Sequence, residues 1–172
     1  LRLVLRIAGF DAAYHPFDWR RDLAWNGREL AERLLRERRK DIILVGHSMG
    51  GLVARGALAH KGAERIARVI QLGTPNRGAF VAVQALRGTY PLIRRLALLD
   101  LKHDAEELAH KLLTTLPGLC GLLPPASACK DFNPFDAAHW PEGPKPTAGD
   151  LRVFVELTLR LALGLLSAVV TL

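Results

Sequence analysis

Apolar residues recur at helical spacing between residues 22 and 40. Leu23, Leu30 and Leu34 fall on one face of such a helix. The opposite face is rich in arginine and glutamate, which is typical of an amphipathic helix on the surface of a domain. We therefore predict a helix over residues 22–40.

The first residues have a different pattern. Residues 1–8 are mostly apolar and are predicted to form helical turns that end at Gly9, a residue suited to a helix C-terminus. Residues 10–14 are short and apolar and lead to Pro16. Because proline cannot donate a hydrogen bond to a neighbouring strand, we predict a strand over 10–14 that ends there.

Residues 42–45 form a continuous apolar run with no polar alternation, and residues 66–72 are predicted to form a second buried strand. Such runs are typical of parallel strands buried on both faces. A helical segment, 52–60, separates them. This order requires a crossover connection, so residues 1–78 are predicted to be an α/β core.

The pattern changes after residue 78. Residues 80–86, 91–101 and 103–116 are predicted to be helical with no strand between them. The segment 117–146 is rich in proline and glycine. We therefore expect a helical and irregular cap over residues 79–150. The tail, 151–172, fits either a strand or a helix with a polar stripe, and we favour a helix.

Composition excludes several classes of protein. Of the 172 residues, 49% are hydrophobic and 24% are charged, which is close to the globular average. The longest clean apolar run, 161–172, is shorter than the roughly 20 residues of a transmembrane helix. The net charge of +7 is spread along the chain, and the 6% of aromatic residues do not interleave with a basic patch. We therefore expect no nucleic-acid partner.

Two cysteines, Cys120 and Cys129, are too few for a disulfide scaffold or a zinc site. We favour two free thiols in an intracellular protein over a bridge between them, and we expect no metal and no cofactor. Met49 is the only methionine and residue 1 is leucine, so we expect an excised fragment, a partial gene product or a start from an unusual codon. The compartment stays open, with the cytoplasm as the default.

One motif carries specific chemistry. Gly46-His47-Ser48-Met49-Gly50 is a G-x-S-x-G sequence between a predicted strand and a predicted helix. In that context the serine stands on a tight turn with its hydroxyl exposed, and small residues two positions before and after it prevent a collision. Ser48 is therefore the candidate nucleophile. The Met49 N–H, at the start of the helix, is the candidate oxyanion donor. His47 is expected to be packed beside the turn.

A catalytic serine needs a base, and the base needs an acid that orients it. In this architecture both follow the serine along the chain. No histidine or aspartate after Ser48 follows a predicted buried strand; these histidines are His60, His103, His110 and His139. We therefore expect no histidine within hydrogen-bond reach of the Ser48 hydroxyl. We also expect at most trace esterase activity from the chain alone.

Three stretches resemble the lecithin:cholesterol acyltransferase-like branch of the α/β-hydrolases, which includes bacterial esterases and phospholipases. They are YHPFDWR at 14–20, VGHSMGGLVAR at 45–55 and LGTPNRG at 72–78. Weaker similarity is found at 122–124 and 135–141, so that the resemblance covers roughly residues 1–145. It implies an α/β fold: a partial α/β-hydrolase fold with a parallel sheet, flanking helices and a helical cap insertion.

The resemblance implies that Ser48 is the acylated nucleophile and that Met49 gives a backbone oxyanion donor. It also implies that Asp18, Trp19 and Arg20 lie beside the site, where we favour a structural ion pair and a packed ring over direct catalysis. Residues of the rim, which we expect to be structural, are Thr74, Pro75 and Asn76.

The leading hypothesis is a serine hydrolase or O-acyltransferase that acts on phospholipid or other ester substrates through an acyl-enzyme on Ser48. The family has a strand and an oxyanion loop before the first helix, and two strands carrying the acid and the histidine after the cap. We find neither here. The alternative is a truncated, catalytically inactive fragment that acts at most as an interaction module. A third hypothesis is a weak membrane-surface contact of the basic tail, through Arg152 and Arg160. The oligomeric state stays open.

Overall fold

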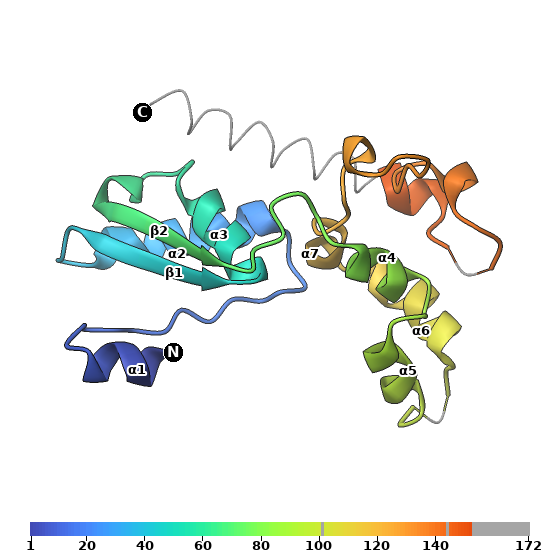
Figure 1. Cartoon of the computed structure of the whole chain (residues 1–172), viewed down its shortest axis with the longest axis horizontal. Coiled ribbons are helices and arrows are strands. Elements are labelled where there is room, and N and C mark those ends of the chain that lie inside the picture. The colour runs from blue at the N-terminus through green and yellow to red at the C-terminus, as the bar shows by residue number, and fades with distance from the viewer. Residues whose placement is uncertain (101, 144, 153–172) are drawn as a thin grey trace.

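The computed structural model describes residues 1–100, 102–143 and 145–152 (Figure 1). Residues 148–152 are helical, and the remainder of the predicted tail helix lies outside the described residues. The chain forms a small sheet with flanking helices and a separate group of short helices. The predicted α/β class is confirmed.

The sheet has two strands, β1 (Ile42–His47) and β2 (Ile66–Leu72), which pair in parallel. Their residues are in register from Ile43, opposite Arg68, to His47, opposite Leu72. The crossover between them contains α3 (Met49–Ala57) and the 3₁₀ turn η1 (Ala63–Arg65). Both strands lie where the apolar runs predict them, and the carboxyl end of β1 leads directly into α3.

The helix α2 (Leu23–Arg36) begins at Asp22, whose carboxylate accepts a hydrogen bond of 2.7 Å from the Trp25 N–H. It ends before the predicted residue 40 because the backbone becomes extended at Glu37. Gly27 of α2 lies against the backbone of Gly56 on α3, so closely that a Cβ at position 27 would come within 2.7 Å of the Gly56 carbonyl carbon. The core between the helices and the sheet consists of Leu23, Leu30, Ala31, Leu34, Val53 and Ala57.

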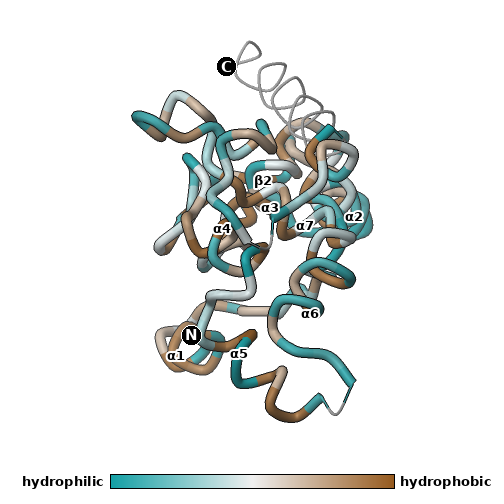
Figure 2. Tube along the Cα trace, turned by 90° about the vertical axis from the view of Figure 1, so that its right-hand side faces the viewer, coloured by the Kyte–Doolittle hydropathy of each residue, from teal (hydrophilic) through white to brown (hydrophobic). Residues whose placement is uncertain are grey.

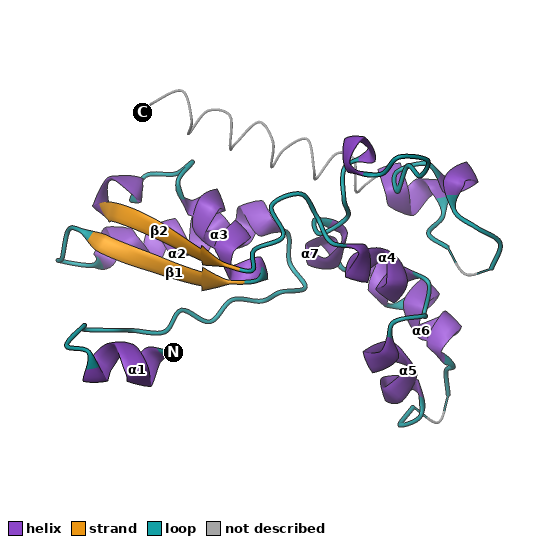
Figure 3. Cartoon of the chain, in the orientation of Figure 1, coloured by secondary structure: helices purple, strands orange, loops and turns teal. Residues whose placement is uncertain are grey.

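Only one face of the sheet is covered in the described part of the chain. Figure 3 shows α2 and α3 behind the two strands. Ile43 is 44% exposed, and Ile70 and Leu72 are also exposed. The prediction that both strands are buried on both faces is therefore wrong, because an unbroken apolar run does not report which face has a covering element.

The N-terminal segment also departs from its prediction. The helix α1 (Arg2–Ile7) ends at Gly9, which has a φ of 88°, as the sequence predicts. Residues 10–14 form no strand, because they pair with neither β1 nor β2. Instead the Tyr14 carbonyl accepts a hydrogen bond of 3.0 Å from the Arg33 guanidinium of α2.

The segment after residue 78 forms the predicted group of short helices. Within the described residues it contains no strand. The α-helices are α4 (Phe80–Leu86), α5 (Pro91–Ala97), α6 (Ala105–Lys111) and α7 (Pro117–Cys120), and the 3₁₀ turns are η2 (Leu113–Thr115), η3 (Ala126–Ala128) and η4 (Ala137–His139). These elements surround a second apolar cluster that includes Leu86, Leu123 and Trp140. We call the described residues between 79 and 150 the cap. The division of the chain into a core of residues 1–78 and a cap stays a prediction.

Candidate active site

Ser48 is the single residue between the end of β1 at His47 and the start of α3 at Met49. Its φ of 52° and ψ of −127° place a non-glycine residue in a strained, left-handed region. Two backbone hydrogen bonds hold the turn: the Ser48 N–H donates to the Leu72 carbonyl at 2.9 Å, and the Gly51 N–H donates to the Ser48 carbonyl at 3.1 Å. Ser48 is exposed at the carboxyl end of β1. The turn has the predicted position, and the catalytic role of Ser48 stays a prediction.

The glycines around the turn are not equivalent. A Cβ at Gly46 would come within 2.5 Å of the Gly51 nitrogen and 2.6 Å of the Gly50 carbonyl group, so position 46 needs glycine. A Cβ at Gly51 would collide with the side chain of Thr74. At Gly50 a Cβ would meet only the Phe17 ring, at an ordinary 3.7 Å. The prediction that Gly46 and Gly50 both prevent a collision is therefore wrong for Gly50, and Gly51 takes that role.

A chain of side-chain hydrogen bonds connects α3 to the end of β2. The Arg55 guanidinium donates to the Asn76 side-chain carbonyl, the Asn76 amide donates to Gln71 at 3.0 Å, and the Gln71 amide donates to the Gly51 carbonyl at 3.0 Å. Asn76 is therefore structural, as expected for the rim. The sequence did not reveal Gln71, because it lies in a strand with no regular polar pattern.

The start of α3 provides the candidate oxyanion donor. The first N–H groups of a helix have no partner within the helix, and within the described residues the Met49 N–H makes no hydrogen bond. The amide dipoles of the nine-residue α3 also favour negative charge at this end. The Met49 N–H is thus free to bind an oxyanion, which is the role that the motif predicts for it.

The Asp18-Trp19-Arg20 segment forms a structural loop. Arg20 donates to both Asp18 carboxylate oxygens, at 2.8 and 2.9 Å, and these bonds lower the pKa of Asp18. The buried Asn26 amide donates to the carbonyls of Asp18, Arg21 and Asp22. The expected ion pair is therefore present. The expected packing of Trp19 is wrong, because its side chain is 50% exposed.

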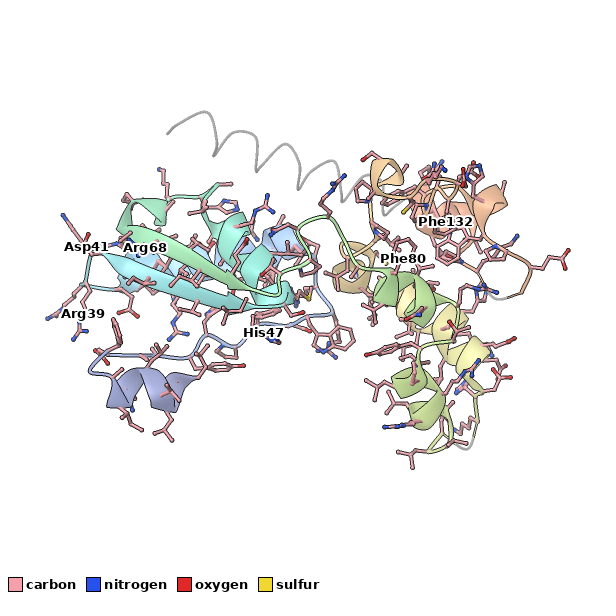
Figure 4. The ribbon with its side chains drawn as sticks, in the orientation of Figure 1. Arg39, Asp41, His47, Arg68, Phe80 and Phe132 are labelled. Atoms are coloured by element: carbon pink, nitrogen blue, oxygen red, sulfur yellow. The ribbon has the colours of Figure 1, made fainter. Side chains whose placement is uncertain are left out.

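All six histidines lie in the described part of the chain, and none of them is hydrogen-bonded to the Ser48 hydroxyl. His139 accepts a hydrogen bond of 3.0 Å from the Asn133 N–H, within the cap. His103 contacts Asp100 at 3.1 Å. His47 is exposed at the end of β1 (Figure 4), so the expectation that it is packed beside the turn is wrong.

His15 gives stability a dependence on pH. Burial and, to a lesser extent, the nearby Arg33 lower the pKa of His15. The unfolded chain therefore binds a proton near pH 6.5 that the folded chain still excludes. We expect the free energy of unfolding to fall as the pH decreases below about 6.5. The decrease ends when the pH reaches the pKa of His15 in the folded chain.

The measurement is urea unfolding at several pH values between about 7.5 and 5.5. The variant His15→Gln is expected to lose less stability over this range than the unmodified chain does. His110→Gln, at an exposed position on α6, is the control and is expected to keep the original slope. An unchanged slope in His15→Gln would contradict the assignment.

Other candidate chemistry is scarce in the described residues. An open hollow of about 400 Å³ is lined by Arg20, Arg21, Trp25 and Thr115 among others and includes neither Ser48 nor Met49. Both cysteines are free, and burial raises the pKa of the Cys120 thiol, so that Cys120 is a poor nucleophile.

Residues 1–100, 102–143 and 145–152 contain no group of three side chains suited to hold a metal. Across the same residues, no helix has the length and apolar character to span a bilayer.

A parallel sheet, a strained serine turn and a helix that starts at the turn define an α/β-hydrolase-like domain. The sequence model of the PGAP1-like alpha/beta domain family matches residues 28–118, which is more than half of the chain and includes Ser48. The chain belongs to this family. The match supports the α/β-hydrolase part of the resemblance and gives no support to the lecithin:cholesterol acyltransferase-like branch. No curated protein and no solved structure matches the chain.

Proposed function

We propose that the chain is a serine-dependent esterase domain that acts on lipid or other ester substrates, with Ser48 as the acylated nucleophile. The observation that carries this proposal is the turn itself. Ser48 is exposed and strained, and it directly precedes the Met49 N–H at the start of α3. Membership of an α/β-hydrolase-like family supports the same chemistry.

The proposed reaction has two steps. The Ser48 oxygen attacks the ester carbonyl carbon, the negative charge moves to the carbonyl oxygen, and the Met49 N–H stabilises it. The bond to the alcohol then breaks, and the serine proton passes to the alcohol as it leaves. Water or an acceptor alcohol next cleaves the acyl–serine bond and releases an acid or a new ester. The choice between them distinguishes a hydrolase from an O-acyltransferase.

A second candidate function, a non-catalytic interaction module, has one observation in its favour. In the described part of the chain the Ser48 hydroxyl makes no hydrogen bond to a histidine that would accept its proton. A serine hydroxyl without a base is a weak nucleophile. Turnover by the chain alone is therefore expected to be slow even if Ser48 is the nucleophile.

The two candidates differ in the turnover of p-nitrophenyl butyrate. For the esterase we expect slow turnover, at most the roughly 10³–10⁴-fold acceleration over water that remains when a triad member is missing. Ser48→Ala is expected to abolish it. The matched control, Ser127→Ala, changes an exposed serine on η3 and is expected to leave the rate unchanged. Turnover that Ser48→Ala does not change would reject the esterase proposal and favour the interaction module.

A further inference from the structure

The first helix presents a basic and apolar surface. In α1, Leu3, Val4 and Ile7 are all largely exposed, and Ile7 is 79% exposed. The same six residues include Arg2 and Arg6 and no acidic residue. These side chains belong to neither buried apolar cluster of the described chain. Contiguous exposed apolar groups are typical of interaction sites.

A second element has the same character. The helix α5 contains Arg94 and Arg95 and no acidic residue. At its end Leu98 and Leu99 are 83% and 81% exposed, the highest values among the large apolar residues of the described chain. An open apolar hollow of about 190 Å³ lies beside them, and its lining includes Ile93, Leu96, Leu108 and Leu112.

The acidic residues near this tip, Asp100, Asp104, Glu106 and Glu107, lie outside α5, in the segment that follows it and on α6. Asp100 accepts hydrogen bonds from the Lys102 N–H at 2.8 Å and contacts the His103 ring at 3.1 Å. On α6, Glu107 pairs with Lys111 at 3.0 Å. The cations on α5 make no salt bridge within the described residues. The end of α5 therefore combines exposed leucines with two arginines that no described carboxylate pairs with.

The two elements lie on the same side of the molecule. Figure 1 and Figure 2 are related by a rotation about the vertical axis, and α1 and α5 are at the lower side in both. Along the horizontal axis of Figure 1, the turn between β1 and α3 lies between them. A flat partner that touches both helices would therefore extend past the end of β1 that carries Ser48.

We propose that α1 and the tip of α5 together form a docking face for an anionic lipid bilayer. Leucine and isoleucine side chains enter the boundary between headgroups and acyl chains, and the flanking arginines contact anionic headgroups. We choose an anionic partner because the two helices carry four arginines and no acidic residue. Binding through the docking face requires no reaction at Ser48, so this proposal does not depend on the proposed esterase activity.

The test is co-sedimentation of the full chain with vesicles of phosphatidylcholine, with and without one quarter phosphatidylglycerol. We expect binding to the anionic vesicles that high salt weakens. Replacing Arg94 and Arg95 together by glutamate is expected to weaken binding at least about 20-fold, since each basic residue near an anionic surface contributes roughly a fivefold factor. Replacing Leu98 and Leu99 together by serine is also expected to weaken it. Both changes lie at exposed positions, so folding is expected to persist, as circular dichroism would verify.

The matched control reverses two charges elsewhere. Arg68 is exposed toward the end of the sheet opposite His47 and Ser48 (Figure 4), and Lys40 is exposed two residues before β1. Their joint replacement by glutamate changes the net charge equally. This control and Ser48→Ala are expected to bind as the unmodified chain does. Equal loss in the control would overturn the assignment to this face. Equal binding to both vesicle types would overturn the anionic partner. Self-association without lipid that the leucine variant abolishes would show that the face binds a second copy instead.

Discussion

Replacing Gly46 by alanine is expected to lower the free energy of unfolding by about 3 kcal/mol, the upper end of the usual cost of over-packing. The new methyl group would come within 2.5–2.6 Å of backbone atoms of Gly50 and Gly51. Backbone atoms at the start of α3 cannot move aside as the end of a long side chain can, so the turn that positions Ser48 must shift. Urea unfolding monitored by circular dichroism measures the change.

Gly50→Ala is the matched control for this prediction. Its methyl group would meet only the Phe17 ring at 3.7 Å. Alanine also favours the helical backbone at this position, so stability is expected to stay the same or to rise by up to about 1 kcal/mol. A similar loss of stability in both variants would contradict the geometry of the turn described here.

Replacing Trp140 by alanine is expected to lower the free energy of unfolding by about 3–5 kcal/mol, the range for the loss of a buried tryptophan side chain. The Trp140 side chain is 3% exposed, and its indole N–H donates to the Pro134 carbonyl at 3.0 Å. Its ring also packs edge-on against Phe132, with 5.5 Å between the ring centres. The substitution would therefore leave a cavity in the apolar cluster of the cap and remove these contacts.

The location of the effect tests the division of the chain into core and cap. Trp140 belongs to the cap cluster, whereas β1, β2 and their helices surround the other cluster. We expect hydrogen exchange in Trp140→Ala to accelerate over residues 80–143 and to change little over 42–72. The control is Trp19→Ala, at a half-exposed position, which is expected to cost less than about 1 kcal/mol. Equal acceleration in both segments would show that the chain unfolds as one unit.

The sequence predicted the elements that depend on local pattern. The strand β1, the helix α3 and the Ser48 turn between them form one continuous segment whose residues carry every signal: an apolar run, small residues and a helix start. Likewise, α4 lies over the predicted residues 80–86. For these elements the pattern and the structure agree because the determining contacts lie within a few residues.

The errors concern contacts that are distant in the sequence. Whether residues 10–14 form a strand depends on a neighbouring strand, and whether Ile43 is buried depends on an element that covers its face. The exposure of Trp19 depends in the same way on elements far along the chain. The requirement for Gly51 comes from Thr74, more than twenty residues later, so the motif alone could not reveal it. An apolar or glycine-rich pattern indicates which environment suits a residue. It does not indicate which distant residue provides that environment.

The most direct test of the central claim is the site of covalent labelling by an alkyl fluorophosphonate, which mimics the ester transition state at a nucleophilic serine. We expect peptide mass spectrometry to locate the label at Ser48, with a rate that exceeds that at the exposed Ser127. We expect Ser48→Ala to remove the label, because the free Met49 N–H stabilises negative charge only beside residue 48. Labelling of Ser48 no faster than Ser127 would contradict its assignment as the nucleophile.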